Sequence, residues 1–80
     1  MGNVAVLFRI YAEAGSEAQV RDEIRKMGPK GTELEEVAFG IKVVKALFIH
    51  DDKEGSSDIE EQLKKIKNVN EVEVIEETLI

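Results

Sequence analysis

The stretch VAFGIKVVKALFIHDDK, residues 37–53, contains a run of β-branched and aromatic residues that predicts a long strand over 41–50. Alternation places Val44, Ala46 and Phe48 on one face of this strand. The opposite face carries its own apolar residues, Val43, Leu47 and Ile49 among them. Polar residues at 51–53 are typical of a turn and end the strand.

The preceding segment GTELEEVAF, residues 31–39, predicts a weaker strand. Its candidates for burial are Leu34, Val37 and Phe39. Gly40 joins the two strands and allows the chain to reverse, so that an aromatic side chain can project beside it. We therefore expect an antiparallel hairpin.

Two other segments have helical spacing, because apolar residues recur at i, i+4 and i+7. These anchors are Val20, Ile24 and Met27 in 17–28, and Ile59, Leu63 and Ile66 in 56–68. Each helix has a potential capping box. The capping pairs are Ser16 with Gln19 and Ser57 with Glu60.

The ends and exposed faces of these helices have further expected features. Gly28-Pro29 stops the first helix. On the second helix, two ion pairs at i, i+4 spacing are expected, Glu60 with Lys64 and Glu61 with Lys65.

The chain begins and ends with strand patterns. Near the start, Val4, Val6, Phe8 and Ile10 alternate with other residues, and in 68–77 Val72 and Val74 alternate with glutamates. The resulting order, β-α-β-β-α-β, predicts one α+β domain over residues 1–80. It is the ferredoxin-like sandwich, a four-stranded antiparallel sheet with two helices on one face.

The second face of this sheet is left open by the predicted fold. Because residues such as Leu7, Tyr11, Val43 and Leu47 would lie there, an apolar patch is expected. Two interpretations remain: flanking side chains cover the patch, or it forms a protein interface such as a homodimer face.

Composition restricts the partners. A net charge of −6 disfavours direct binding to nucleic acid and favours a basic protein or a protein that itself works on nucleic acid. The chain has no cysteine, no export signal pattern and no apolar run long enough to span a bilayer. We expect a cytoplasmic protein without a membrane partner.

No catalytic, cofactor or metal site is predicted. His50 is the single histidine and is interpreted as an ordinary residue at a strand end. Adjacent carboxylates such as Asp51-Asp52 are typical of solvated surface. No glycine-rich phosphate loop occurs.

The segment AFGIKVVKALFIHDDKEGSSDIEEQL resembles the archaeal translation elongation factor 1-beta family and the C-terminal exchange domain of its eukaryotic relatives. The motifs that carry the resemblance are FGIK at 39–42, DDK at 51–53, GTEL at 31–34 and the hydrophobic C-terminus. The resemblance implies a guanine nucleotide exchange factor for the GTPase elongation factor 1-alpha. Such a factor catalyses no covalent reaction.

The resemblance also implies partner-binding residues, namely Phe39, Gly40, Leu79 and Ile80. Phe39 matches an aromatic that the eukaryotic relatives present to the GTPase, although a core or turn-packing role is the alternative. In those relatives a lysine beside the last residue reaches toward the magnesium site. Residues 76–80 here contain no lysine, so this end would act by steric or carboxylate means, or another group would serve.

Two other functions are weighed against exchange. One is a ferredoxin-like small-ligand sensor or assembly domain that oligomerises through its open sheet face. The other, an acylphosphatase-like hydrolase, would need an arginine in a phosphate-cradling loop, whereas Arg21 falls inside the first predicted helix.

Overall fold

The computed structural model describes residues 2–51 and 56–80. The chain forms four strands and two helices in the predicted order. Their bounds are β1 Asn3–Ala12, α1 Glu17–Arg25, β2 Gly31–Ala38, β3 Ile41–Asp51, α2 Ser56–Lys64 and β4 Val69–Leu79. The polar turn predicted after β3 falls largely on residues 52–55, outside the described residues.

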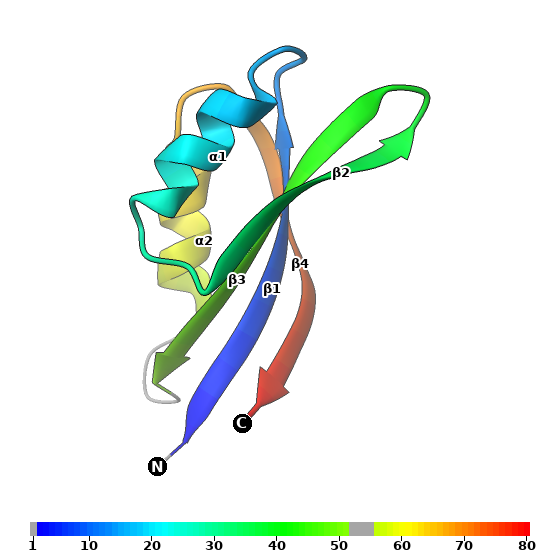
Figure 1. Cartoon of the computed structure of the whole chain (residues 1–80). Coiled ribbons are helices and arrows are strands. Elements are labelled where there is room, and N and C mark those ends of the chain that lie inside the picture. Colours follow the sequence, from blue (N-terminus) through cyan, green and yellow to red (C-terminus); the bar gives the residue numbers. More distant parts are fainter. Residues whose placement is uncertain (1, 52–55) are drawn as a thin grey trace.

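The strands form one antiparallel sheet in the order β2-β3-β1-β4. Both helices cover the same face of this sheet, and the two ends of the chain lie together at one end of the molecule (Figure 1). The ferredoxin-like α+β prediction is therefore confirmed, including the β2–β3 hairpin.

The core is centred on the two inner strands. Val6, Phe8 and Ile10 of β1 are fully buried. They pair with Phe48, Ala46 and Val44 of β3, respectively. The Phe8 and Phe48 rings meet edge to face, with centroids 5.8 Å apart and an interplanar angle of 78°. This favourable aromatic geometry fixes the centre of the helix-facing side.

The predicted helix anchors complete this core. Val20 and Ile24 of α1 and Leu63 of α2 are fully buried, while Met27, Ile59 and Ile66 pack against the cluster at its margin. Met27 and Ile66 follow the last helical residues, because α1 ends at Arg25 and α2 at Lys64. The 3.6-residue period thus identified the contacts correctly but made both helices too long.

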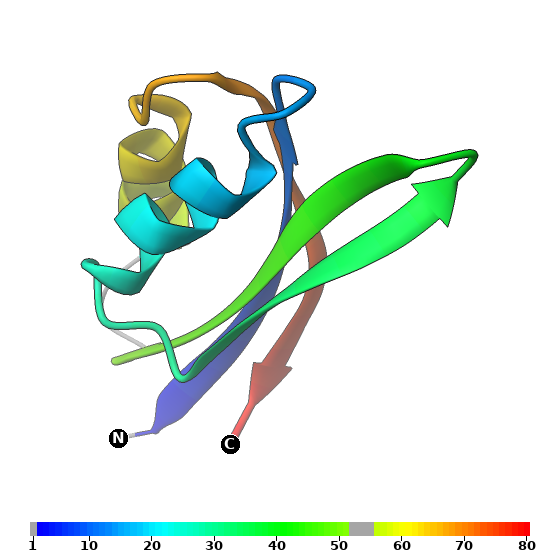
Figure 2. The ribbon, with the colours of Figure 1, turned by 45° about the horizontal axis from the view of Figure 1, so that its top comes forward.

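The strands are much longer than the helices. At about 3.3 Å per residue, the 11 residues of β3 extend over roughly 36 Å. At about 1.5 Å per residue, the nine residues of each helix cover about 14 Å. The β2–β3 hairpin consequently extends beyond the helices, as Figure 2 shows. Within residues 2–51 and 56–80, both ends of the sheet extend past the helices.

The capping box predicted at Ser16 is wrong. Ser16 is the N-cap of α1, but its side chain makes no capping hydrogen bond. Its ψ of 7° lies outside the β-region that aims an N-cap side chain at the first free N–H groups. Glu17 Oε1 instead accepts a hydrogen bond from the Gly15 backbone N–H at 3.0 Å. The side chain of Ser57, and with it the second predicted box, lies outside the described residues.

One of the two predicted ion pairs on α2 is present. Lys64 Nζ lies 3.4 Å from Glu60 Oε2. Within the described residues, Lys65 forms no ion pair with Glu61, so the second pairing was wrong. Helical spacing brings such side chains within reach but adds only a few tenths of a kcal/mol, too little to hold two long solvated chains together.

Ile24→Ala should lower the free energy of unfolding by about 2–5 kcal/mol, because it leaves a cavity between α1 and the sheet. Ile75→Ala is the matched control, since Ile75 is 38% exposed. The control should change stability by less than about 1 kcal/mol. Urea titration followed by circular dichroism measures both values, and equal losses would contradict the placement of Ile24.

Candidate functional site

The β2–β3 hairpin closes through the residues Phe39 and Gly40, which have φ values of +43° and +82°. Ala38 and Ile41 pair on either side of this two-residue loop. Positive φ at both loop positions is the pattern of a type I′ turn, in which Asn-Gly is the preferred sequence. Gly40 fits this preference, whereas a phenylalanine with positive φ is strained.

The end of the hairpin is apolar and exposed. We define the hairpin tip as Val37, Phe39, Gly40 and Ile41. The exposed fractions of its three large side chains are 44% for Val37, 104% for Phe39 and 57% for Ile41. Burial of Val37 and Phe39 was predicted and is wrong, and the core alternative for Phe39 falls with it. The tip lies beyond the reach of the helices, so no core exists there to receive these side chains (Figure 2).

Phe39 therefore carries two costs that nothing within the described chain offsets. A left-handed backbone costs a non-glycine residue about 1–2 kcal/mol. The ring is also fully exposed to water. An added Cβ at Gly40 would meet no atom within 4 Å, so the turn requires glycine there for its backbone angles and not for space. Strained residues of this kind cluster at binding sites, which makes Phe39 a candidate contact residue.

The predicted contact residues at the C-terminus are exposed as well. Leu79 is 71% and Ile80 is 60% exposed. Two backbone hydrogen bonds fix this end to the start of β1, from Ile80 N to Asn3 O at 2.8 Å and from Asn3 N to Ile80 O at 3.3 Å. The last residues thus form an ordered edge beside β1 (Figure 1).

A β-bulge in β4 decides which face each terminal residue occupies. Phe8 pairs with Val74 and Leu7 with Glu76, so Ile75 has no partner on β1. Beyond this extra residue the alternation is reversed. Leu79 pairs with Val4 on the helix side of the sheet, whereas Ile80 lies on the open side with Thr78.

The hairpin tip and the C-terminus lie at opposite ends of the molecule. β3 runs from the tip at Ile41 to Asp51, which pairs with Asn3 beside Ile80. Ten residue steps along a strand correspond to roughly 33 Å. The molecule is 41 Å long in its largest dimension. The structure therefore divides the four predicted partner-binding residues between two separate surfaces.

The open sheet face is only partly apolar. Val43 is fully buried there, beside Glu35 and Tyr11 of the neighbouring strands, so the prediction that flanking side chains cover the patch holds at this position. Nearer the chain ends, a shallow hollow of about 320 Å³ remains. Its lining residues are Ala5, Leu7, Leu47, Glu76, Thr78 and Ile80.

Ion pairs cross the middle of the same face. Lys45 Nζ lies 2.9 Å from Glu35 Oε2, and Arg9 Nη1 lies 3.2 Å from Glu73 Oε1. A side-chain hydrogen bond with Tyr11, together with the nearby charges of Glu73 and Glu35, raises the pKa of Arg9 above its ordinary value. The face therefore has an apolar half near the chain ends and a charged band at its centre.

The described residues contain no group of three or more histidine, cysteine, aspartate or glutamate residues placed to hold a metal ion. His50 is buried, and its Nδ1 donates a hydrogen bond to the Asp51 carbonyl oxygen at 2.7 Å. No helix in the described part of the chain is long and apolar enough to cross a membrane.

Comparison with known proteins identifies the class. A family model described as the EF-1 guanine nucleotide exchange domain matches residues 14–80, which include both helices and the whole hairpin. The protein is thus of the class that exchanges guanine nucleotides in translation elongation. Elongation factor 1-beta of Methanoculleus marisnigri is 33% identical over 84 residues, covering 100% of each chain. The chain belongs to the elongation factor 1-beta family.

Sequence reasoning missed two members of the tip, Val37 and Ile41. Val37, Phe39 and Ile41 are spaced by two residues, a signal that they share one end of the hairpin. Val37 and Phe39 were instead expected to be buried and Ile41 to lie on the open face, because nothing in the sequence pattern reveals where the helices end.

Phe39→Asn should raise the free energy of unfolding by up to about 1 kcal/mol, because asparagine accepts a positive φ and the lost ring contacts no core. Phe39→Val should lower it by a similar amount, since a β-branched residue is disfavoured there. Urea titration tests the pair. A loss of stability in the asparagine variant would mean that the ring packs inward.

Proposed function

We propose that this chain binds elongation factor 1-alpha and promotes the release of GDP so that GTP can enter, with no covalent step. The family assignment supports exchange in elongation. We choose Phe39 as the main contact residue because its backbone is strained and its ring is fully exposed. Strained backbone conformations cluster at functional sites, which supports a contact made by this ring. The protein acts in the cytoplasm and contacts neither nucleic acid nor membrane directly.

Exchange by binding requires a difference in affinity. The factor must bind the nucleotide-free GTPase more tightly than the GDP form, and linkage makes GDP bind more weakly by the same ratio. No cation at the C-terminus supplies this difference, because residues 76–80 contain no lysine or arginine. The exposed Leu79 and Ile80 side chains are the groups that this end presents.

Two contact surfaces roughly 30 Å apart suit a mechanism that acts across a partner's surface. The tip is stiffened by cross-strand pairing from Gly31 to Ile41 and by the Lys45–Glu35 ion pair. The C-terminus is fixed by the Asn3–Ile80 hydrogen bonds. Contact at both ends would therefore hold two places on the GTPase at a set separation, and only conformations compatible with that separation would bind well.

A homodimer through the open sheet face is the second arrangement. The hollow lined by Leu7, Leu47 and Ile80 favours it. Light scattering at millimolar protein concentration tests this arrangement. A dimer mass that reverts to the monomer in Leu47→Glu would support it, and a monomer mass throughout would exclude it.

Phe39→Ala should weaken binding to nucleotide-free elongation factor 1-alpha by about 10- to 100-fold, as expected for a central aromatic anchor. Release of a fluorescent GDP, followed by stopped flow, should slow at subsaturating protein. Ile75→Ala is the control, because it removes a partly exposed apolar side chain away from both ends. Unchanged GDP release by the wild-type protein at saturation would refute the proposed function.

The two ends should contribute independently. Leu79→Ala/Ile80→Ala should also weaken binding, and combining it with Phe39→Ala should give the sum of the two losses to within about 0.5 kcal/mol, because the sites share no contacts. Isothermal titration with the nucleotide-free GTPase measures the cycle. No loss from the terminal substitutions would restrict the contact to the hairpin tip.

A further inference from the structure

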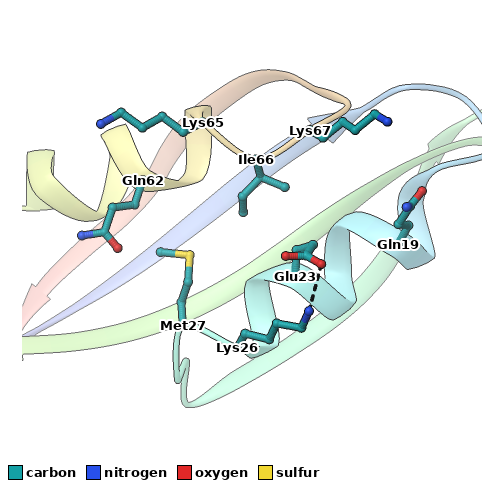
Figure 3. A pocket seen from close by; sticks show the side chains of 8 residues that line it. All are labelled: Gln19, Glu23, Lys26, Met27, Gln62, Lys65, Ile66 and Lys67. Atoms are coloured by element: carbon teal, nitrogen blue, oxygen red, sulfur yellow. Dashed lines mark hydrogen bonds and ion pairs between the residues drawn. The ribbon is translucent and has the colours of Figure 1, made fainter.

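A groove runs between α1 and α2 on the side of the molecule opposite the open sheet face. It has a volume of about 600 Å³. Met27 and Ile66 point toward one another across it (Figure 3). The other lining residues are polar, namely Gln19, Glu23, Lys26, Gln62, Lys65 and Lys67. The groove thus combines an apolar floor with a rim of long polar side chains.

The charge of the rim is positive and only partly neutralised. Lys26 Nζ forms an ion pair with Glu23 Oε1 at 3.0 Å, drawn as the dashed line in Figure 3. Within the described residues, neither Lys65 nor Lys67 has an ion-pair partner. Their side chains extend in opposite directions on either side of Ile66. A ligand lying along the groove would therefore meet one free ammonium group on each side of its centre.

This positive rim contrasts with the rest of the molecule. The four strands together contain eight acidic and three basic residues. The segments 17–27 and 56–67, which contain the two helices and the groove-lining residues that follow them, carry six acidic and six basic residues. The net charge of −6 therefore comes from the strands and the rest of the chain and not from the residues around the groove.

We propose that this groove binds an acidic peptide segment that inserts an apolar side chain between Met27 and Ile66. Free ammonium groups complement carboxylates, and the apolar floor provides burial for the anchor. RNA suits the groove less well, because three lysines neutralise few phosphates and the lining has no aromatic side chain on which a base could stack. This site is distinct from the hairpin tip and the C-terminus, and it does not depend on the exchange function.

A fluorescein-labelled peptide copy of residues 69–80 is a suitable probe, because its four glutamates are interspersed with apolar residues. A second peptide with glutamine in place of each glutamate is its control. Fluorescence anisotropy with the full chain should show binding of the acidic peptide that weakens between 50 and 200 mM salt, and at least tenfold weaker binding of the neutral peptide.

Two double variants of equal charge locate the site. Lys65→Glu/Lys67→Glu should weaken binding roughly tenfold or more, since two exposed charge contacts are reversed. Lys30→Glu/Lys42→Glu, at exposed positions outside the groove, should change it less than twofold. Circular dichroism confirms folding, and Lys65→Gln/Lys67→Gln, expected to weaken binding severalfold, replaces the first variant if that one unfolds.

Several outcomes would overturn the proposal. Equal losses in the two charge-reversed variants would indicate attraction by overall charge. Full binding by the Lys65 and Lys67 variants would place the peptide elsewhere, for example on a sheet edge. Tighter binding of a 12-nucleotide oligouridine than of the peptide would assign the groove to RNA. If neither probe changed its anisotropy at millimolar protein, the groove would bind neither class of ligand and the proposal would be wrong.

Discussion

The pairing of β1 with β3 is the contact on which the rest of the structure depends. It sets Val6, Phe8 and Ile10 opposite Phe48, Ala46 and Val44, and the Phe8–Phe48 edge-to-face contact lies within this strip. Both helices find their buried surface there, through residues such as Ile24 and Leu63. A one-residue slip between the two strands would turn the entire apolar set to the open face. The position of every other element follows from this register.

A mismatch in length between strands and helices explains where the candidate site lies. The core strip attracts two short helices to the middle of the sheet, and the longer strands continue past them at both ends. Apolar side chains on those ends, Phe39 at one and Leu79 and Ile80 at the other, are left without a cover. The structure thus presents two apolar surfaces at a fixed separation, which is the arrangement that the proposed exchange mechanism requires.

Charge is divided between the layers of the fold. The strands hold most of the excess acidic residues, and cross-strand ion pairs such as Arg9–Glu73 neutralise part of that charge at the centre of the open face. The helices and the residues that follow them carry balanced charge, and among the described residues Lys65 and Lys67 beside the interhelical groove have no ion-pair partner. A chain of net charge −6 can therefore present surfaces of opposite sign to different partners.

The sequence by itself determined the order of elements, the antiparallel sheet and nearly all of the core, because apolar periodicity reports which side of an element is buried. The resemblance carried by the FGIK motif also singled out Phe39 and Gly40, which form the exposed turn of the hairpin. The sequence did not predict the exposure of Val37 and Phe39, the lack of a side-chain cap at Ser16 or the lack of an ion pair between Glu61 and Lys65. These features depend on where the helices end and on how the backbone angles direct the side chains. Only the tertiary structure separated the tip from the C-terminus and, through the bulge at Ile75, put Leu79 and Ile80 on opposite faces. The register of the strands and the part of the sheet that the helices cover arise from packing between distant segments. A local sequence pattern carries no information about either.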